Sequence, residues 1–498
     1  MNRLSLAGLV VAVLVGVSGC TAGSAIADPG SPSRTTFTVL QINDVYEITP
    51  VEGGRAGGLA RVAGLRQQLL AEGTPVVTVM AGDFLSPSAL GTARVEGERL
   101  YGKQMVAVLN ALGLDAAAVG NHEFDVSEDA LQARIAEADF PFVSANIVRP
   151  DGSPFPNVAP RVVLDLEAAD GPVRVGIASV VLPSNEKPYV RYLPADSTLR
   201  AEVARLDPVT DVVIGLTHQG FAADATAAAT IPGLDAVMGG HEHENVRAYR
   251  GPNLTPVMKA DANARTAYVH RFTLDRATGT LEVDSELVPI TSSTPEDPAV
   301  AAIVTEWVEV ASAGFRADGF DPDRVAVVTT ETLDGRESTV RTRPSRLGGL
   351  IADGFRRAAG VEVGLFNGGS IRVDDVLGAG PFTEYDAIRV LPFGGEVVTV
   401  EMPGALLSRV LDQGVANAGT GGFLQTAGLE GGPGAWRIEG AALEGDRLYT
   451  VATNDFLVTG RETGLDYFDA ETNPDVTLIG EHGDVRRALI DELARTYR

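Results

Sequence analysis

The chain has 498 residues, which at roughly 100–200 residues per domain predicts two to four domains. It is 45% hydrophobic and 21% charged, so it can bury a full core and does not have the composition of a disordered protein. Its 66 acidic and 40 basic residues give a net charge of −26, which excludes nucleic-acid binding through a broad basic surface. Its single cysteine excludes disulfides within the chain and Cys-rich zinc sites.

The N-terminus has the pattern of a targeting segment. Residues 4–17 form an apolar run that is shorter than the ~20 residues needed to span a bilayer, and we interpret residues 1–19 as a signal peptide. Small residues before Cys20 are typical of a bacterial lipobox, which predicts lipidation of Cys20. An ordinary signal peptide, cleaved a few residues further on, is the alternative. Residues 20–35 are small and polar and are predicted to form a flexible lipoprotein tether.

From Thr36 onward, short apolar runs alternate with amphipathic stretches, which predicts an α/β layered domain over residues 36–295. The predicted strands span residues 37–42, 76–80, 116–119, 142–145, 173–181, 212–216, 236–238 and 255–259. The predicted helices span residues 59–70, 102–112 and 127–138, the last with Ser127 as its N-cap. Residues 268–290 predict a hairpin that closes this domain.

The pattern changes after the hairpin. Residues 296–324 are predicted to be a linker region, in which residues 300–313 form a connecting helix. A second α/β pattern covers residues 325–498 and predicts a separate C-terminal domain.

Polar side chains that can bind metal ions follow five predicted strands directly, where open α/β sheets form their binding crevices. Four of the six histidines lie in these segments. The segments are Asn43-Asp44-Val45-Tyr46, Gly82-Asp83, Gly120-Asn121-His122-Glu123, Thr217-His218 and Gly240-His241-Glu242-His243. A lone histidine after a strand is usually an ordinary loop residue, but five such junctions in order indicate a metal site.

The ligand types suggest the chemistry. Carboxylate, amide and imidazole groups without thiolate suit divalent ions such as Mn²⁺, Zn²⁺, Fe²⁺ or Mg²⁺. A carboxylate that bridges two ions holds them about 3.5–4 Å apart, the spacing that clamps the attacking and leaving oxygens of a phosphoryl group. Metal-bound water is acidified to a pKa near neutrality and becomes the nucleophile. These residues therefore predict metal-assisted attack on a phosphate ester.

The ordered motifs resemble those of the calcineurin-like metallophosphoesterases. With Gly57-Gly58-Leu59-Ala60-Arg61 and the second domain, the chain resembles the bacterial UDP-sugar hydrolase/5′-nucleotidase family from about Phe37 to the C-terminus. The resemblance implies a four-layered α/β/β/α metallophosphoesterase domain, joined by a helix to a C-terminal α/β 5′-nucleotidase domain. It also implies two divalent metal ions, and their identity could be Mn, Zn, Fe, Mg or Ca.

The resemblance further implies a ligand set in which Asp83 bridges the two ions. One ion would also take Asp44 and His243, and the other Asn121, His218 and His241.

By the same resemblance, His122 would stabilise charge in the transition state or protonate the leaving oxygen. Asp125, three residues on, would orient His122. The alternative for Asp125 is an acidic residue at a helix N-terminus, stabilised by the helix dipole.

One position departs from the family pattern. The first motif is usually Asp-x-His, whereas this chain has Asp44-Val45-Tyr46. A phenol has a reference pKa near 10 and is a poor ligand for a divalent ion. Either Tyr46 coordinates a hard ion, or water takes that position, or the first site binds its metal weakly; the latter two are favoured.

The second domain carries glycine-rich segments of another kind. One of these follows an apolar run and reads Phe366-Asn367-Gly368-Gly369-Ser370-Ile371-Arg372. Its glycines permit close approach of the backbone, and the guanidinium of Arg372 offers a planar fork for phosphate. By the resemblance, phosphate and nucleoside would contact Arg343, Asn367 and Arg372, and two aromatic rings would sandwich the base. Those rings would be Phe393 and either Tyr467 or Phe468; packing in the core is the alternative for all three.

These residues predict an exported, lipid-anchored phosphohydrolase that acts on small nucleotides at the interface of its two domains. The substrate could be a 5′-mononucleotide, a nucleotide sugar or a 2′,3′-cyclic nucleotide. A thiosulfohydrolase of related fold is the alternative enzyme, and a surface lipoprotein that binds nucleotide or metal with weakened catalysis is the alternative without full activity. No nucleic-acid partner is expected, membrane contact is expected only through the lipid anchor, and the oligomeric state stays open.

Overall fold

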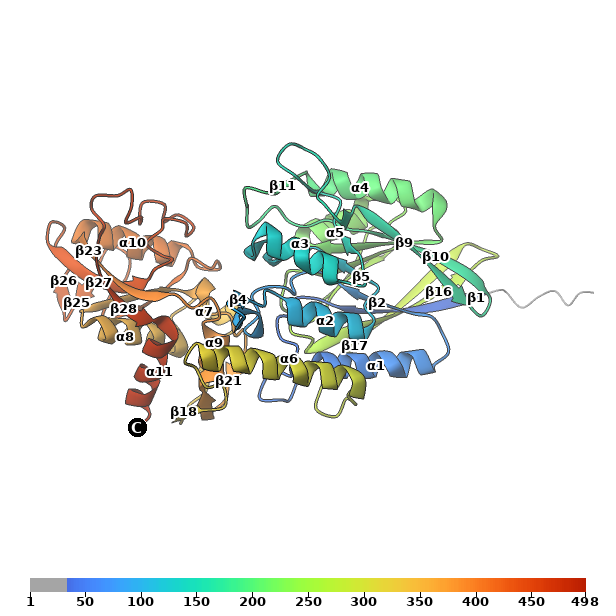
Figure 1. Ribbon diagram of the computed structural model, residues 1–498. Coiled ribbons are helices and arrows are strands. Elements are labelled where there is room, and N and C mark those ends of the chain that lie inside the picture. Colours follow the sequence, from blue (N-terminus) through green and yellow to red (C-terminus); the bar gives the residue numbers. More distant parts are fainter. Residues whose placement is uncertain (1–33) are drawn as a thin grey trace, which may run out of the picture.

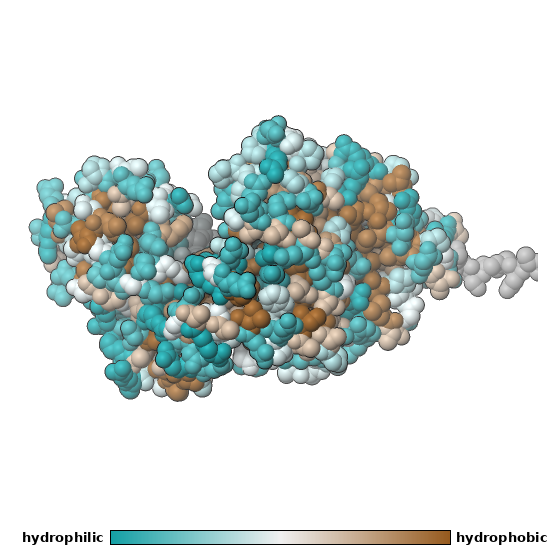
Figure 2. Space-filling view, viewed as in Figure 1, coloured by the Kyte–Doolittle hydropathy of each residue, from teal (hydrophilic) through white to brown (hydrophobic). Residues whose placement is uncertain are grey.

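The computed structural model describes residues 34–498 and has two lobes (Figure 1). The predicted signal peptide, Cys20 and the tether up to residue 33 lie outside the described residues. The larger lobe contains the N-terminal domain and the smaller one the C-terminal domain, and Figure 2 shows an indentation between them. Helix α6 (Pro298–Ala317) runs along the larger lobe towards the smaller one.

The N-terminal domain contains two stacked sheets. The first has seven strands in the order β17 (Thr280–Pro289), β16 (Thr266–Asp275), β1 (Arg34–Ile42), β2 (Val76–Met80), β5 (Ala116–Ala118), β6 (Phe142–Val143) and β8 (Val158–Ala159). The second has six, in the order β14 (Val246–Arg250), β15 (Thr255–Lys259), β13 (Ala236–Gly240), β12 (Val212–His218), β10 (Gly171–Ala178) and β9 (Arg161–Ala168). One apolar cluster joins them, with Val39 and Val77 from the first sheet and Ile214 and Met238 from the second.

Helices cover the outer face of each sheet. Residues such as Val62 and Leu109 pack the first group onto the first sheet, and Leu199 and Val203 pack the second group onto the second sheet. The first group is α1 (Leu59–Ala71), α2 (Lys103–Leu112) and α3 (Glu128–Glu137), and the second is α4 (Ala195–Leu206) and α5 (Phe221–Thr230). The domain therefore has the predicted four-layered α/β/β/α architecture.

Most predicted elements of this domain are present with ends shifted by a few residues. Ser127 caps α3, accepting a hydrogen bond from the backbone of Ala130. The predicted hairpin is formed by β16 and β17, and β16 also pairs with β1, so the hairpin extends the first sheet. Strand β9 and helices α4 and α5 were not predicted. β9 is an edge strand with mostly half-exposed side chains, and α5 is rich in alanine, so neither has a strong apolar period.

Helix α6 lies at the predicted linker and is longer than the predicted 300–313. Asp297 caps it through the backbone N–H groups of Ala299 and Val300. Among the described residues, it is the one helix that is long and apolar enough to cross a membrane by composition. Its buried residues, Val304 and Phe315 among them, belong to the cluster that packs α1 and α2, and a packed core helix meets the same criteria.

The C-terminal domain is built on a five-stranded sheet with helices on both faces. Phe355 of one face and Leu411 of the other belong to separate apolar clusters. The strand order is β24 (Leu424–Ala427), β20 (Val363–Asn367), β27 (Leu448–Asn454), β23 (Glu396–Pro403) and β28 (Thr477–Asp484). The helices are α7 (Glu337–Val340), α8 (Arg346–Ala359), α9 (Glu384–Val390), α10 (Gly404–Ala416) and α11 (Val485–Thr496).

Short two-stranded ribbons complete the described fold. They are β3 (Arg94–Val95) with β4 (Glu98–Arg99), β7 (Ile147–Val148) with β11 (Arg191–Tyr192), β18 (Val325–Thr329) with β22 (Gly380–Thr383), β19 (Leu333–Asp334) with β21 (Val376–Leu377), and β25 (Arg437–Ile438) with β26 (Ala441–Ala442).

Parallel pairing explains where the polar segments meet. β1, β2 and β5 run parallel in the first sheet, and β12 and β13 run parallel in the second. Their carboxyl ends therefore lie at one edge of each sheet, and loops from five strands converge there.

Candidate active site

The backbone at the strand ends is held in unusual conformations. Asp44 and Asp83 have positive φ values of 51° and 56°, which residues other than glycine seldom adopt. Such strain persists only where the surroundings enforce it, and it is concentrated at functional sites. Glycine is required close by, since a Cβ on Gly120 would lie 2.1 Å from Asp83 Oδ1.

Glu123 fixes the loop that carries Asp83. Its buried carboxylate accepts backbone hydrogen bonds from Asp83 at 2.9 Å, Phe84 at 2.8 Å, Leu85 at 3.1 Å and Gly120 at 2.6 Å. Burial and the nearby Asp83 charge raise the pKa of Glu123 to about 7, although these N–H groups act in the opposite direction. Glu123 thus ties the segments after β2 and β5 together without facing the site.

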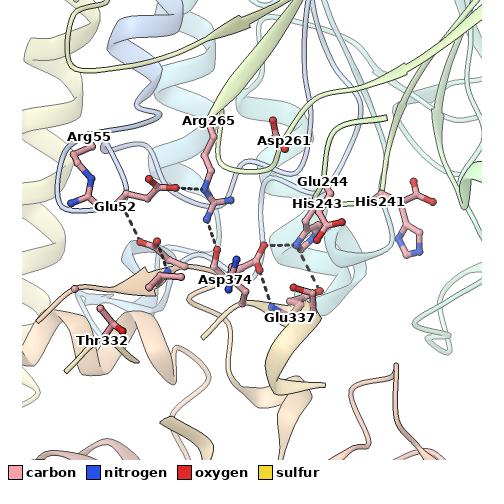
Figure 3. Close-up of a pocket in the computed structure, with 16 residues that line it drawn as sticks. Glu52, Arg55, His241, His243, Glu244, Asp261, Arg265, Thr332, Glu337 and Asp374 are labelled. Carbon is pink, nitrogen blue, oxygen red and sulfur yellow. Dashed lines mark hydrogen bonds and ion pairs between the residues drawn. The ribbon is translucent and has the colours of Figure 1, made fainter. Parts of the chain in front are cut away.

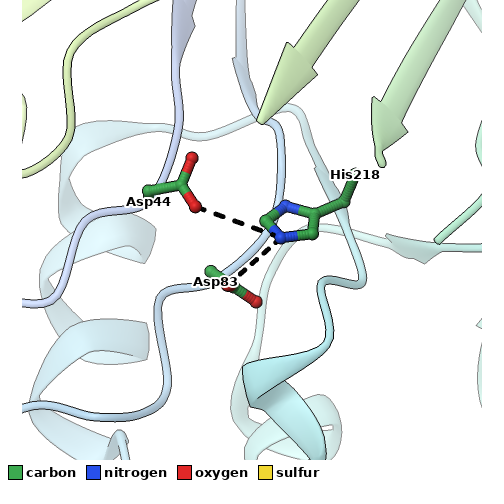
Figure 4. Close-up of side chains that lie close together, drawn as sticks. All are labelled: Asp44, Asp83 and His218. Atoms are coloured by element: carbon green, nitrogen blue, oxygen red, sulfur yellow. Dashed lines mark ion pairs between the residues drawn. The ribbon is translucent and has the colours of Figure 1, made fainter. Parts of the chain in front are cut away.

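Three buried side chains form the centre of the site (Figure 4). The ligand atoms of Asp44, Asp83 and His218 lie within 4.8 Å of one another, and all three residues are at most 1% exposed. His218 Nδ1 donates to the carbonyl of Ala81 at 2.8 Å, so Nε2 faces the carboxylates, 3.1 Å from Asp83 Oδ2. Burial alone would lower the pKa of His218, but the charges of Asp83 and Asp44 raise it to about 10. The two carboxylates therefore attract positive charge to this point.

The donor atoms fit a divalent ion. Within the described chain, Asn121 Oδ1 is buried without a hydrogen-bond partner, and His218 Nε2 faces the carboxylates of Asp83 and Asp44, at 3.1 Å and 4.0 Å; both residues belong to the predicted ligand set. Buried polar atoms are rarely left unpaired. Carboxylate, amide and imidazole atoms around one point are the donors that Mn²⁺, Zn²⁺ and similar ions accept.

His243 and His241 border this centre from the loop after β13. His243 Nε2 lies 3.7 Å from Asp44 Oδ1, and the backbone N–H of His241 donates to Asp44 Oδ2 at 3.0 Å. Burial, aided by the charge of His218, lowers the pKa of His241 to about 4, which keeps its ring neutral and able to act as a ligand. The structure thus places His243 and His241 beside the cluster of Asp44, Asp83 and His218, and the ring centres of His241 and His218 are 5.6 Å apart.

The loop of His241 and His243 rests on a buried ion-pair network. Lys259 is fully buried and lies 2.8 Å from Asp224 Oδ2, and it also pairs with Glu242. Lys259 further donates to the carbonyl of Gly240 at 2.8 Å. A buried lysine with this many partners fixes the loop, and no local sequence pattern indicated it.

Tyr46 fills the position where the family pattern usually has histidine. Its hydroxyl lies 3.1 Å from His243 Nε2 and 3.4 Å from Asp83 Oδ2. Burial, together with the charges of Asp83 and Asp44, raises the pKa of Tyr46 well above its ordinary value. The phenol is therefore neutral and acts as a hydrogen-bond donor beside the carboxylates.

His122 and Asp125 form a pair at the entrance to this centre. His122 Nδ1 lies 2.8 Å from Asp125 Oδ2, and Asn185 donates to the other carboxylate oxygen at 2.7 Å. Burial acts to raise the pKa of Asp125, but the His122 imidazole outweighs it and lowers that pKa. An ionised Asp125 accepts from Nδ1–H, so Nε2 of His122 points away from it.

A loop of the C-terminal domain reaches these residues. Arg372 Nη2 lies 3.3 Å from His122 Nε2, and its guanidinium is 5.9 Å from the ring centre of Tyr46. Glu337 pairs with Arg372 at 3.1 Å and also with Arg341. Two guanidinium groups therefore share Glu337 next to His122 and Asp125.

A cavity of about 500 Å³ lies between the two domains and is lined by Asp125, the partner of His122. Asp125 and Asn185 line one side of it, and Asn367 and Glu462 the other, with Asn367 Nδ2 donating to Glu462 Oε2 at 2.8 Å. Phe393 and Phe456 also line it and are 41% and 39% exposed, unusual for large apolar side chains. We call this space the aromatic cavity.

Comparison with known proteins assigns both domains. The family described as "Calcineurin-like phosphoesterase" matches residues 37–245, and "5'-nucleotidase, C-terminal domain" matches residues 325–470. A 5'-nucleotidase of Bos taurus is 27% identical over 446 residues, covering 79% of this chain and 74% of that protein. The chain thus joins a calcineurin-like phosphoesterase domain to a 5′-nucleotidase C-terminal domain. It is a metal-dependent phosphoester hydrolase by this relationship.

Solved structures share the fold of this two-domain chain. A 5'-nucleotidase precursor from Thermus thermophilus has a TM-score of 0.76 at 24% identity, covering 93% of this chain and 97% of that one. The sulfate thiohydrolase SoxB from Thermus thermophilus has a TM-score of 0.68 at 16% identity, covering 94% and 95%. The fold alone therefore does not separate a nucleotidase from a thiohydrolase, and the side chains of the site must do so.

Three residues predicted to bind substrate lie away from the aromatic cavity. Arg343 is exposed, and its guanidinium reaches Thr339. Tyr467 is covered by the guanidinium of Arg409, 3.5 Å from its ring centre, and Phe468 is fully buried in the core of the domain.

Three other residues of the C-terminal domain lie beside Arg372 or the aromatic cavity instead. Arg341, two positions earlier than Arg343, faces Arg372; Phe456 faces the aromatic cavity; and Glu462 holds Asn367. Phe456 is the second residue after β27, so the strand-end rule that marked the metal ligands could have found it.

Proposed function

We propose that this protein hydrolyses small nucleotides, with phosphate bound at the metal centre and the base in the aromatic cavity. The observation that carries the proposal is the contact between Arg372 and His122. This contact joins the two domains beside the ligand cluster, and Asp125, the partner of His122, lines the aromatic cavity. A phosphate ester can therefore reach both at once.

Each group has a task in this arrangement. Two divalent ions, held by Asp83 and the ligands around it, would polarise the phosphoryl group and activate the attacking water. Arg372 and Arg341 bind the phosphate oxygens through charge-assisted hydrogen bonds, and Glu337 keeps the two guanidiniums in place. His122, whose Nδ1–H is held by Asp125, directs Nε2 towards the leaving oxygen. As an imidazolium it also carries a proton on Nε2, which it gives to the leaving oxygen to become the neutral ring.

The aromatic cavity supports a nucleoside as the leaving group. Phe393 and Phe456 offer two exposed rings on which a base can stack. Glu462 and Asn367 lie beside them, and a carboxylate next to an amide can accept hydrogen bonds from ribose hydroxyls and donate to a base. A thiohydrolase has no need of such a pair of rings, so nucleotides are favoured over the alternative.

The substrate and the metals are tested together. Phosphate release from AMP, UDP-glucose and 2′,3′-cyclic AMP is measured with Mn²⁺, Zn²⁺, Mg²⁺ and Ca²⁺ after metal removal, with Asp83→Asn as the inactive control. Release from AMP in at least one metal supports the proposal, and the other two substrates define its range. Failure on all three, under conditions where the protein binds metal, would overturn it.

We also propose that the protein is exported and anchored by a lipid at Cys20, on the strength of residues 1–20 alone. Expressed in a bacterial host, the wild type should partition into detergent and Cys20→Ser into the aqueous phase. Equal partitioning of the two would contradict lipidation at Cys20.

A further inference from the structure

The outer nitrogen of His243 is held by the other domain (Figure 3). Its Nε2 faces Asp44 in the metal centre, while Nδ1 lies 2.9 Å from Asp374 Oδ2. Asp374 belongs to the C-terminal domain, on the same short loop as Arg372. A carboxylate accepts a hydrogen bond, so Nδ1 carries the proton and Nε2 keeps its place towards the metal centre.

Asp374 is itself fixed from both domains. Its second oxygen, Oδ1, accepts from the backbone N–H of Glu337 at 2.9 Å. Its backbone carbonyl accepts from Arg265 of the N-terminal domain, and Arg265 in turn pairs with Glu52 at 3.1 Å. The residue is 8% exposed and has a positive φ of 38°. These contacts fix the orientation of the Asp374 carboxylate, with Oδ2 directed at His243.

His218 and His243 differ in which domain supplies the partner of the outer ring nitrogen. The outer nitrogen of His218 donates to a carbonyl of its own domain, Ala81 at 2.8 Å. Metal-binding histidines usually have such a partner, which fixes the ring and makes it a better donor. For His243 that partner is supplied only when the C-terminal domain is in place.

We propose that Asp374 is a positioning residue for the metal centre, and that the C-terminal domain thereby completes the site that contains His243. The proposal rests on the metal centre of the proposed function but not on the identity of the substrate. Because Arg372 and Asp374 share a loop, one movement of the C-terminal domain changes phosphate binding and the orientation of a metal ligand together.

Glu337 is a weaker candidate for this role. It lies 3.7 Å from His243 Nδ1, beyond hydrogen-bonding distance, and its charge is already matched by Arg341 and Arg372. A second cavity, of about 700 Å³, exposes the contact between Asp374 and His243 to solvent and is lined mainly by charged side chains. Water there would hydrate Nδ1 and leave the ring free to turn if Asp374 were removed.

The test measures metal binding without substrate. Mn²⁺ is titrated by calorimetry into the metal-stripped, folded full-length protein, as wild type, Asp374→Ala and Asp374→Asn. Residues that support a metal ligand typically contribute about 10–100-fold to affinity, so Asp374→Ala should weaken binding at one site by that factor. Asp374→Asn should lose less, because its amide oxygen still accepts a hydrogen bond from Nδ1–H.

Asp375→Asn is the matched control. Asp375 is the next residue, also buried, and it bridges the domains by accepting from the backbone of Glu52 at 3.1 Å, but it does not touch His243. Its Mn²⁺ affinity should equal that of the wild type. The proposal is overturned if Asp374→Ala binds Mn²⁺ like the wild type at both sites, or if Asp375→Asn weakens binding as much as Asp374→Ala.

Activity separates this proposal from the proposed function. If the wild type hydrolyses AMP, excess Mn²⁺ should restore much of the activity that Asp374→Ala lacks at low Mn²⁺. If the wild type binds Mn²⁺ and hydrolyses no nucleotide, the proposed function fails while the Mn²⁺ titrations still decide the role of Asp374.

Discussion

The two domains build their parts of the site in different ways. In the N-terminal domain, ligands follow parallel strands directly, and buried contacts such as those of Glu123 and Lys259 leave their backbone little freedom. In the C-terminal domain, the groups that face the site lie on loops or a short helix, and two of its aromatic rings are exposed. A metal centre needs ligands fixed to within fractions of an ångström, whereas a base needs only flat surfaces at a suitable distance.

This difference predicts where a substitution does most harm. Changes in the rigid N-terminal centre should act on the chemical step, and changes in the aromatic cavity should act on substrate binding. The loop of Arg372 and Asp374 belongs to the C-terminal domain but contacts His122 and His243. Substitutions in this loop should therefore act on the chemical step, like those in the N-terminal centre.

The largest effect is expected for Asp83→Asn. Loss of even a supporting residue typically costs about 10–100-fold, so losing a carboxylate of the candidate ligand cluster itself should lower kcat for AMP by more than about 100-fold. Steady-state kinetics in saturating Mn²⁺ measures this. Asp196→Asn makes the same chemical change on the surface of α4 and should leave kcat unchanged. An active Asp83→Asn would contradict a two-metal mechanism.

Arg372→Ala should come next. Removing one preorganised donor to the reacting group typically costs about 10²–10³-fold in kcat, and Arg372 also contacts His122. Arg372→Lys should recover only part of this, because an ammonium lacks the planar fork. Kinetics with AMP provides the measurement, and Arg343→Ala is the control, since Arg343 is exposed and away from the centre. Equal losses in Arg372→Ala and Arg343→Ala would reject the placement of phosphate at Arg372.

The same difference explains what the sequence could predict. The α/β layering followed from the alternation of apolar and amphipathic runs, and the four-layered arrangement from the family resemblance. The proximity of Asp44, Asp83 and His218 followed from the strand-end motifs, because parallel strands bring their carboxyl ends together whatever the loops do. The choice between Arg341 and Arg343 could not be made from spacing, because the two arginines lie two positions apart. Phe456 was missed although it lies just beyond the end of β27. Asp374 and Lys259 act through contacts between distant segments, which no local pattern records.

Substitutions in the aromatic cavity should raise KM with a smaller effect on kcat. Stacking on an aromatic ring is worth about 1–3 kcal/mol per base, so Phe456→Ala or Phe393→Ala should raise KM for AMP by roughly 5–150-fold. Tyr467→Ala should leave KM unchanged, because Arg409 covers that ring. Ribose 5-phosphate, which lacks a base, should be hydrolysed equally well by all four proteins. A rise in KM for Tyr467→Ala but not Phe456→Ala would place the base elsewhere.

The smallest effect is expected at Tyr46, and it tests whether the phenol is a ligand. The hydroxyl is buried with a raised pKa and donates a hydrogen bond beside His243 and Asp83, so it should stay neutral. A neutral phenol is a poor partner for a divalent ion, so Tyr46→Phe should change Mn²⁺ affinity little in a calorimetric titration. Tyr46→His supplies an imidazole at the same point and should tighten binding at one site. If Tyr46→Phe instead weakens binding markedly, the phenol is itself a ligand, and the rigid centre holds its metals with an oxygen donor where its relatives' pattern has nitrogen.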